Sequence, residues 1–286
     1  MVPGSGVGAS PARQLWAAVE PLHAVVYFAP ETAEAAKAAG LRGYWMGYFA
    51  GRLAPLGRIG PAAATSMLFG FAPEMVARAL PDAWSFASPA DVVRSRLDAV
   101  SAALRRTLGP DDPEELAALL SRAAEACECD GRPLAAGWAA VPKPPESWSR
   151  LWLAATVLRE HRGDGHVLAA VHAGLSGLET TLTHIGDGVI GRADVQPHRG
   201  WSDEQWNRAT DRLRARGILD ADGRLTETGR ALRHRIEEDT DRLAAAPAEE
   251  LGKDLERLLE LAVPLSRALI DAGVVPVPNP MGVSRP

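Results

Sequence analysis

Residue types suited to acid–base chemistry gather near the middle of the chain, in LREHRGDGHVLA, residues 158–169. Gly163 suits the end of one helix and Asp164 can cap the start of the next, so the pattern predicts a helix break at residues 162–165. His166 would then lie in a first helical turn, where the positive end of the helix dipole disfavours the imidazolium form. We therefore expect a neutral His166, suited to act as a base, a hydrogen-bond partner or a metal ligand.

His184 follows His166 by 18 residues. If one helix runs through both, His184 returns to the same face after five turns, about 27 Å away. Ala170, Ala173 and Gly177 lie between them on that face, and such small residues predict the close approach of a neighbouring helix or a ligand. The alternative for the whole segment is a solvated turn whose histidine is only hydrogen-bonded.

A second stretch whose residue types could bind or act on a ligand is YWMGYFAGRLAPLG, residues 44–57. Tyr44, Tyr48 and Arg52 recur every four residues, so they share one side of the predicted helix, beside a row of glycines with the same spacing. Two hydroxyl groups and a guanidinium group in a row can line a pocket for an acidic or planar ligand. The alternative is two core tyrosines with backbone partners and an arginine that caps the helix end.

The two stretches together suggest a small-molecule site between the N-terminal helices and the central segment, because a ligand site requires polar groups that converge in a mainly apolar cleft. The candidate lining is His23, Tyr27, Tyr44, Tyr48, Arg52, Arg159, Glu160, His161 and His166. If the protein is an enzyme, a point that the sequence leaves open, His166 would be the general base, and Tyr44 or Arg52 would stabilise negative charge.

No cofactor can be assigned from the sequence, which has no P-loop, dinucleotide glycine motif, nucleophile elbow or zinc-ligand set. A metal or haem site would use His161 or His166. These two residues are five apart, whereas a helical metal site favours a spacing of four, so no metal site is predicted.

The composition excludes some classes of protein. The formal net charge of −5, from 31 basic and 36 acidic residues, gives no general attraction for nucleic acid. Cys127 and Cys129 form neither a disulfide framework nor a zinc site, which favours a reducing cytoplasm. We find no signal peptide and no apolar run of about 18 residues, and so expect no membrane segment.

Proline and glycine divide the chain into short helical segments, many of which begin with a capping residue such as Ser10 or Ser88 followed by proline. The expected units are a disordered leader at 1–10, a helical bundle at 11–140, a proline-rich linker at 141–148, a central helix pair with a long loop at 149–200, a winged-helix element at 201–246, and C-terminal helices with a proline-rich tail at 247–286.

The winged-helix assignment depends on an ordered set of signals after residue 200. Ser202 and Gln205 form a capping box, Gly217 ends the helix, and an Asp-Gly turn at 220–223 lies between aliphatic residues, which predicts a small hairpin before Thr226 caps the next helix. The predicted fold class is therefore mainly α: an irregular helical bundle followed by a winged helix-turn-helix element with one small β-hairpin.

DNA contact by this element would use Arg208, Arg212 and Arg224. Residues 203–216 contain four arginines and three acidic residues, a net charge of 4 − 3 = +1, which is weak for a helix that reads DNA. A winged helix can also serve as a packing or protein-contact module, because fold does not fix function.

Several phrases together resemble the SalK-like winged-helix family of actinobacteria: YWMGYFAGRLAPLG, LREHRGDGHVLA, GWSDEQW, ETGRALRHRIEEDTDRLAA and PVPNPMG. The resemblance extends from about residue 12 to residue 282 and implies a MarR-like helix-turn-helix relative, some members of which lie in biosynthetic clusters. It implies no catalytic residues.

Three functions remain open from the sequence. The first is a small-molecule-binding protein of specialised metabolism, with or without enzyme activity. The second is a DNA-binding regulator that senses a metabolite, and the third is a scaffold that binds a protein partner. The C-terminal helices can either build a homodimer or pack back on the bundle.

Overall fold

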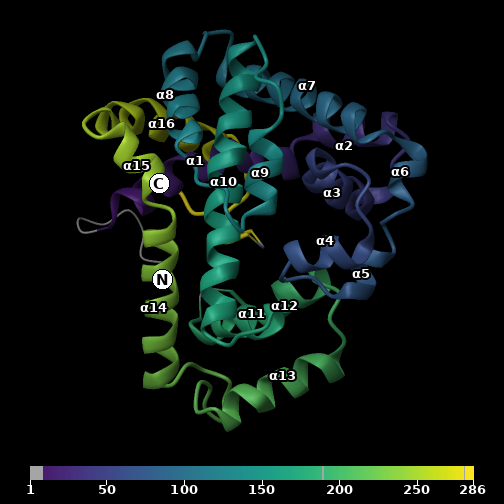
Figure 1. Cartoon of the computed structure of the whole chain (residues 1–286), viewed down its shortest axis with the longest axis vertical. Helices are drawn as coiled ribbons and strands as arrows, with labels where there is room; N and C mark the ends of the chain where they lie inside the picture. The colour runs from purple at the N-terminus through teal and green to yellow at the C-terminus, as the bar shows by residue number, and fades with distance from the viewer. Residues whose placement is uncertain (1–8, 189, 280) are drawn as a thin grey trace.

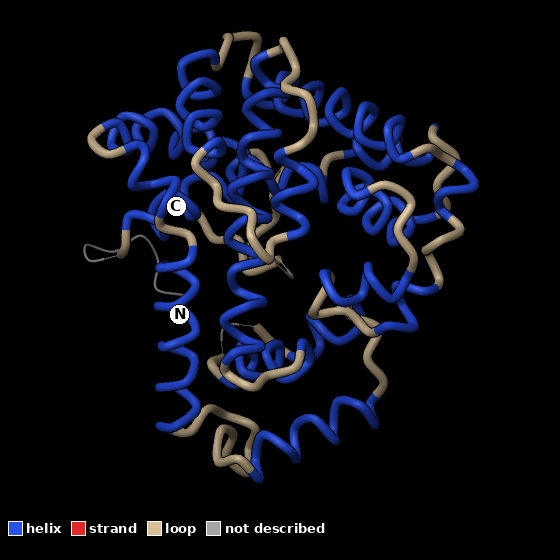
Figure 2. The backbone as a smooth tube through the Cα atoms, viewed as in Figure 1, coloured by secondary structure: helices blue, strands red, loops and turns tan. Residues whose placement is uncertain are grey.

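The computed structural model describes residues 9–188, 190–279 and 281–286, and the regular elements in these ranges are helical (Figure 2). The N-terminal half contains α1 (Pro11–Phe28), α2 (Pro30–Ala38), α3 (Gly43–Leu53), the 3-10 turn η1 (Ala54–Leu56), α4 (Pro61–Met67), α5 (Pro73–Ala77), α6 (Ala83–Phe86), α7 (Pro89–Leu108), α8 (Glu114–Glu125) and α9 (Pro133–Ala139). The C-terminal half contains α10 (Ser147–His172), α11 (Gly177–Gly186), α12 (Arg192–Val195), the 3-10 turn η2 (Gln196–His198), α13 (Asp203–Ala215), α14 (Glu227–Leu243), α15 (Ala246–Leu251) and α16 (Asp254–Asp271).

Local capping residues start several helices where the sequence predicts them. The hydroxyl groups of Ser10 and Ser88 accept from the backbone N–H three residues later, and a proline occupies the first helical position. Ser202 and Gln205 form the predicted reciprocal capping box at the start of α13. These beginnings depend only on nearby residues, and the predictions for them are confirmed.

Helix α10 runs through the middle of the molecule (Figure 1). It packs against α1, α7, α8, α9 and α14, so side chains are buried on most of its circumference. Its apolar residues, such as Trp152, join α1, α7, α8 and α16 in the largest core, while a second core lies among α3 to α6. A third core joins the end of α10 to α11, α13 and α14. One helix therefore supports both halves of the chain.

The predicted helix break at residues 162–165 is wrong, because α10 continues through it to His172. The Asp164 carboxylate accepts from the backbone N–H groups of Leu134 (2.9 Å) and Ala135 (3.1 Å), so it caps α9 and not a new helix. Gly165 allows the Leu243 side chain of α14 to pack against the helix. Asp164 and Gly165, which both lie within the predicted break, thus serve the packing of α10 against α9 and α14.

The predicted separation of His166 and His184 is also wrong. Helix α10 ends at His172, and Ser176 caps α11 in a new direction. As a result, the imidazole rings of His166 and His184 lie with their centroids 5.8 Å apart. The chain reversal turns a pair expected at opposite ends of one helix into a direct contact.

The segment predicted to be a winged-helix element, residues 201–246, contains α13 and α14, and α13 lies across the lower end of the molecule in Figure 1. The prediction of a mainly α fold is confirmed. The predicted β-hairpin is not: within the described residues only one antiparallel bridge forms there, between Leu219 and Leu225. Two backbone hydrogen bonds flank this bridge, from the Asp220 N–H to the Arg224 carbonyl (2.9 Å) and from the Thr226 N–H to the Ile218 carbonyl (3.1 Å), while the Leu225 N–H donates to the carbonyl of Gly186 (3.0 Å) in α11.

The C-terminal helix α16 packs back on α1, where the Ser266 hydroxyl donates to the carbonyl of Ala18 (2.6 Å). Helix α10 begins at Ser147, inside the segment expected to be a linker. The expected leader falls mostly on residues 1–8, which lie outside the described residues. None of the helices described here combines the length and the apolar character that a membrane span needs.

Candidate functional site

A buried ion pair links α10 to α3. Glu160 accepts from Arg52 at 3.0 Å and 2.6 Å, a bidentate geometry, and from Arg159 Nη1 at 2.9 Å. Burial on its own would raise the pKa of Glu160, but the neighbouring guanidinium groups outweigh it and hold this pKa at about 2. The carboxylate is therefore ionised, and it fixes two arginines predicted to line the site.

His23 extends the pair into α1. The Thr156 hydroxyl donates to the Trp152 carbonyl (2.8 Å), so it accepts from His23 Nδ1 (3.0 Å). His23 Nε2 is then left as the acceptor for the Tyr27 hydroxyl (3.2 Å). Burial, assisted by the charge of Arg159, lowers the pKa of His23 well below its usual range. His23 is thus a neutral acceptor that orients the Tyr27 hydroxyl.

The rings of Tyr27, Tyr48 and Tyr44 follow one another from His23 toward solvent. The ring centroids of Tyr27 and Tyr48 are 5.1 Å apart, those of Tyr44 and Tyr48 are 6.1 Å apart, and Arg52 Nη1 donates to the Tyr48 hydroxyl at 3.2 Å. Tyr44 is 53% exposed and Tyr48 is half-buried, whereas His23 is fully buried. The group therefore reaches from the core to solvent.

Arg96 of α7 belongs to the same group, although the sequence analysis did not include it. Its guanidinium lies 5.6 Å from the ring centroids of both Tyr27 and Trp152. A signal was available: Arg96 is four residues from both Val92 and Val100, so it interrupts the apolar stripe of its helix. A charged residue in that position faces the core.

Two more charged residues complete the group. Glu20 of α1 pairs with Arg159 at 3.6 Å, and burial raises the pKa of Glu20. Arg199, which follows η2, packs over the Phe71 ring at 4.4 Å and interacts electrostatically with Tyr48. We call the whole set the arginine–tyrosine cluster: Glu20, His23, Tyr27, Tyr44, Tyr48, Arg52, Arg96, Arg159, Glu160 and Arg199.

Two predicted residues of the site lie elsewhere. His161 faces α9 and contacts the Arg132 guanidinium. His166 contacts α14, where the Thr240 hydroxyl donates to the Ile236 carbonyl (2.7 Å) and so accepts from His166 Nδ1 (3.0 Å). Burial lowers the pKa of His166 to about 4, so the expected neutral state is found, with burial and not a helix start as its main cause. The structure does not bring His166 together with Tyr44 and Arg52.

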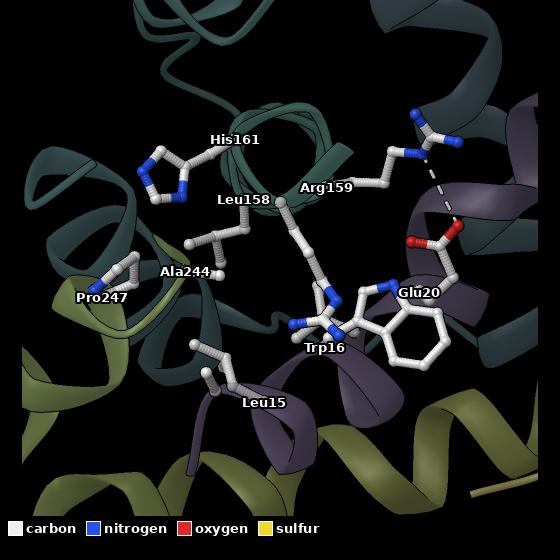
Figure 3. Close-up of a pocket in the computed structure, with 11 residues that line it drawn as sticks. Leu15, Trp16, Glu20, Leu158, Arg159, His161, Ala244 and Pro247 are labelled. Atoms are coloured by element: carbon white, nitrogen blue, oxygen red, sulfur yellow. Dashed lines mark ion pairs between the residues drawn. The ribbon is translucent and has the colours of Figure 1, made fainter. Parts of the chain in front are cut away.

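A small cavity lies beside the cluster, between α1, α10 and the start of α15 (Figure 3). Glu20 and Arg159 form part of its wall together with Trp16 and Leu158. Its volume of about 20 Å³ is room for roughly one water molecule. Among the described residues, buried Glu20 Oε2 and Arg162 Nη1 find no hydrogen-bond partner, and a water molecule there could reach such groups.

The candidate DNA-contacting arginines lie on the surface of α13 and the turn after it. Arg208 pairs with Glu204, Arg212 with Glu179 at 2.9 Å, and Arg224 with Asp222 at 3.7 Å. The opposite side of α13 packs into the third core through Trp206, Ala209 and Leu213. The outer face is therefore accessible, but its positive charges are matched by carboxylates of the same chain.

In the described part of the chain, no group of three or more histidine, cysteine, aspartate or glutamate side chains is arranged to hold a metal ion. Comparison with curated proteins and with solved structures finds no significant match to this chain. A helix-turn-helix family model, by contrast, matches residues 12–276, which is nearly the whole chain. The protein therefore belongs to this helix-turn-helix family.

Proposed function

We propose that this helix-turn-helix protein binds a small molecule at the arginine–tyrosine cluster. The observation that carries the proposal is the convergence of polar side chains from α1, α3, α7, α10 and the segment after η2 at one place in an otherwise apolar bundle. Polar groups that meet in a mainly apolar surrounding, and reach solvent on one side, are the usual composition of a ligand site.

Incomplete hydrogen bonding in and beside the cluster supports the same function. Buried Arg96 Nε and Glu20 Oε2 have no partner among the described residues. A buried polar atom without a partner costs about 1–3 kcal/mol, so such atoms are rare unless water or a ligand meets them. Since His166 lies apart from the cluster, the proposal is for binding, and it assigns no general base.

The resemblance to SalK-like proteins adds a proposed source and class of ligand. It favours a metabolite from actinobacterial specialised metabolism. The two cysteines, Cys127 and Cys129, favour a protein that works in a reducing cytoplasm. A homodimer stays a prediction, which light scattering of the purified protein tests directly.

The decisive experiment uses the protein purified from its natural host. We expect native mass spectrometry to show a species heavier than the chain by the mass of one ligand, and we expect Arg52→Met to reduce that species. Arg208→Met, which changes an exposed arginine far from the cluster, is the control. A wild-type protein that carries no ligand, and whose melting temperature no host metabolite extract changes, would contradict the proposal.

DNA binding is a second candidate, favoured by family membership and by the accessible outer face of α13. Such binding would be electrostatic and would weaken steeply as salt concentration rises. Fluorescence anisotropy with a labelled duplex at two salt concentrations tests it. A regulator that senses a metabolite would combine both functions in one chain.

A further inference from the structure

Three of the arginines in the arginine–tyrosine cluster have partners inside the protein. Both oxygens of Glu160 accept from Arg52, and one of them also accepts from Arg159 Nη1. Glu20 faces Arg159 from the other side, with 3.6 Å between Glu20 Oε1 and Arg159 Nε. Arg199 has an interaction of its own within the chain. None of these three side chains therefore needs an external anion.

Arg96 differs from them, because no carboxylate of the described residues lies within ion-pair distance of it. Its buried Nε finds no hydrogen-bond acceptor there, and its guanidinium lies 5.6 Å from the ring centroids of both Tyr27 and Trp152. Ring faces attract a cation, but a carboxylate oxygen accepts its hydrogen bonds much more strongly. Burial, assisted by the charge of Arg52, lowers the pKa of Arg96. One positive charge of the cluster is thus without a counter-ion.

The position of the Arg96 guanidinium depends on a glycine of α3. A methyl group at position 51 would lie 2.1 Å from Arg96 Nη1, so Gly51 provides the space that this end of the side chain occupies. The rings of Tyr27 in α1 and Trp152 in α10 lie on other sides of the guanidinium. Three helices therefore surround it, and since Arg96 is only half-buried, part of its surface is accessible to a ligand.

A series of tyrosine rings leads from this guanidinium toward solvent. The ring centroid of Tyr27 is 5.1 Å from that of Tyr48, which in turn is 6.1 Å from that of Tyr44. The rings of Tyr44 and Tyr48 are inclined by only 29°, and Tyr44 is exposed. Arg96 also interacts electrostatically with Tyr44. A planar ligand that pairs with Arg96 would thus meet an aromatic surface with the rest of its body.

We propose that the arginine–tyrosine cluster binds a single carboxylate group on a planar, aromatic body, and that Arg96 pairs with the carboxylate. The inference rests on the proposed small-molecule function and names its ligand class. A guanidinium binds a carboxylate through two parallel N–H···O bonds. One unmatched cation requires one negative charge, which favours a carboxylate over a phosphate monoester, whose charge is about −1.5 to −2 at neutral pH.

The test is calorimetric titration of the whole chain with benzoate, benzamide, phenyl phosphate and acetate. Benzoate and benzamide have nearly the same size and shape but differ in charge. We therefore expect benzoate to bind at least about tenfold more tightly than benzamide, a difference of about 1.4 kcal/mol. Phenyl phosphate should bind more weakly than benzoate because its second charge has no partner, and acetate should do so because it has no ring.

Three results of this titration overturn the inference. Benzamide that binds as tightly as benzoate would show that charge is not recognised. Phenyl phosphate or acetate that binds as tightly as benzoate would contradict the single charge or the aromatic body. Absence of benzoate binding would exclude the site itself.

Substitutions in α7 locate the carboxylate. Arg96→Met should reduce the affinity for benzoate by at least about tenfold, since it removes a charged hydrogen-bond donor. Arg96→Lys keeps the charge but not the two-point geometry, so it should retain more affinity than Arg96→Met. The control is Arg94→Met, which changes an arginine of the same helix that is 69% exposed and pairs with Asp91. Unchanged benzoate affinity in Arg96→Met overturns the assignment.

The two proposals fail in different ways. If the protein from its host retains a compound that has no carboxylate and benzoate does not bind, the small-molecule function stands and the carboxylate inference is wrong. If nothing is retained, no host extract changes the melting temperature and none of the probes binds, both are wrong. The wild-type titration needs no variant, so a variant that fails to fold leaves the test intact.

Discussion

The arginine–tyrosine cluster and the surface of α13 use the same residue type in opposite ways. On α13, Arg208 and Arg212 are each matched by a carboxylate and remain in contact with solvent. In the cluster, guanidinium groups outnumber carboxylates and lie inside or partly inside the bundle. Water screens the first set at little cost, while the second depends on Glu160 and Glu20 inside the protein for its counter-charges. The comparison identifies the cluster as the place where an external partner has most to contribute.

The largest expected effect on stability concerns the buried ion pair of the arginine–tyrosine cluster. Glu160→Gln would leave Arg52 and Arg159 without their shared counter-charge and should lower the free energy of unfolding by about 3–5 kcal/mol. Urea denaturation followed by circular dichroism measures it. Glu204→Gln, the matched change on α13, should alter stability by less than about 1 kcal/mol. Equal effects of the two substitutions would show that burial does not separate the regions.

An intermediate effect concerns the junction between the regions, where His166 and His184 meet. Burial lowers their pKa values to about 4 and about 3. An unfolded histidine, with a pKa of about 6.5, binds a proton before the folded one does, so stability is lost as pH falls from about 6.5 toward 4. We expect each of the two rings to contribute a loss of roughly 3 kcal/mol over this range, since one pKa unit corresponds to about 1.4 kcal/mol.

The measurement is urea denaturation of the wild type and of His166→Asn at pH 7 and pH 4.5. The variant should show a smaller loss, since it lacks one of the buried histidines that titrate over this range. His23 and His161, whose pKa values burial also lowers, contribute equally to both proteins. His234→Asn, whose imidazole is 74% exposed, should behave like the wild type. The same pH dependence in all three proteins would exclude the buried pair as its source.

The smallest expected effect concerns DNA binding by the exposed surface of α13. If α13 contacts DNA, Arg212→Ala should weaken duplex binding similarly for all sequences and reduce the slope of log affinity against log salt by about 1. Glu204→Gln, which frees Arg208 from its partner, should strengthen binding by a small factor. Fluorescence anisotropy across a salt series measures both. Absence of duplex binding at low salt would leave α13 as a packing or protein-contact helix.

Much of the candidate site could be anticipated, because its members lie on regular helical stripes. The four-residue spacing of Tyr44, Tyr48 and Arg52 predicted one shared side, and the structure shows these residues together with Glu160. Arg96 was missed, although its interruption of the apolar stripe of α7 marks it as facing the core; which residues it meets there depends on helices that are distant in the sequence. His166 was assigned to the wrong neighbours because the expected helix break does not occur.

The sequence by itself determined where helices begin, at Ser10, Ser88 and Ser202, because a cap is made by a side chain and a backbone group three residues apart. It also determined the helical character of nearly every segment. Only the tertiary structure decided that α10 continues past Gly163, that His166 meets His184, and that the turn after α13 forms a single bridge. Each of these outcomes depends on which distant group takes a hydrogen bond or fills a space, and local sequence does not contain that information.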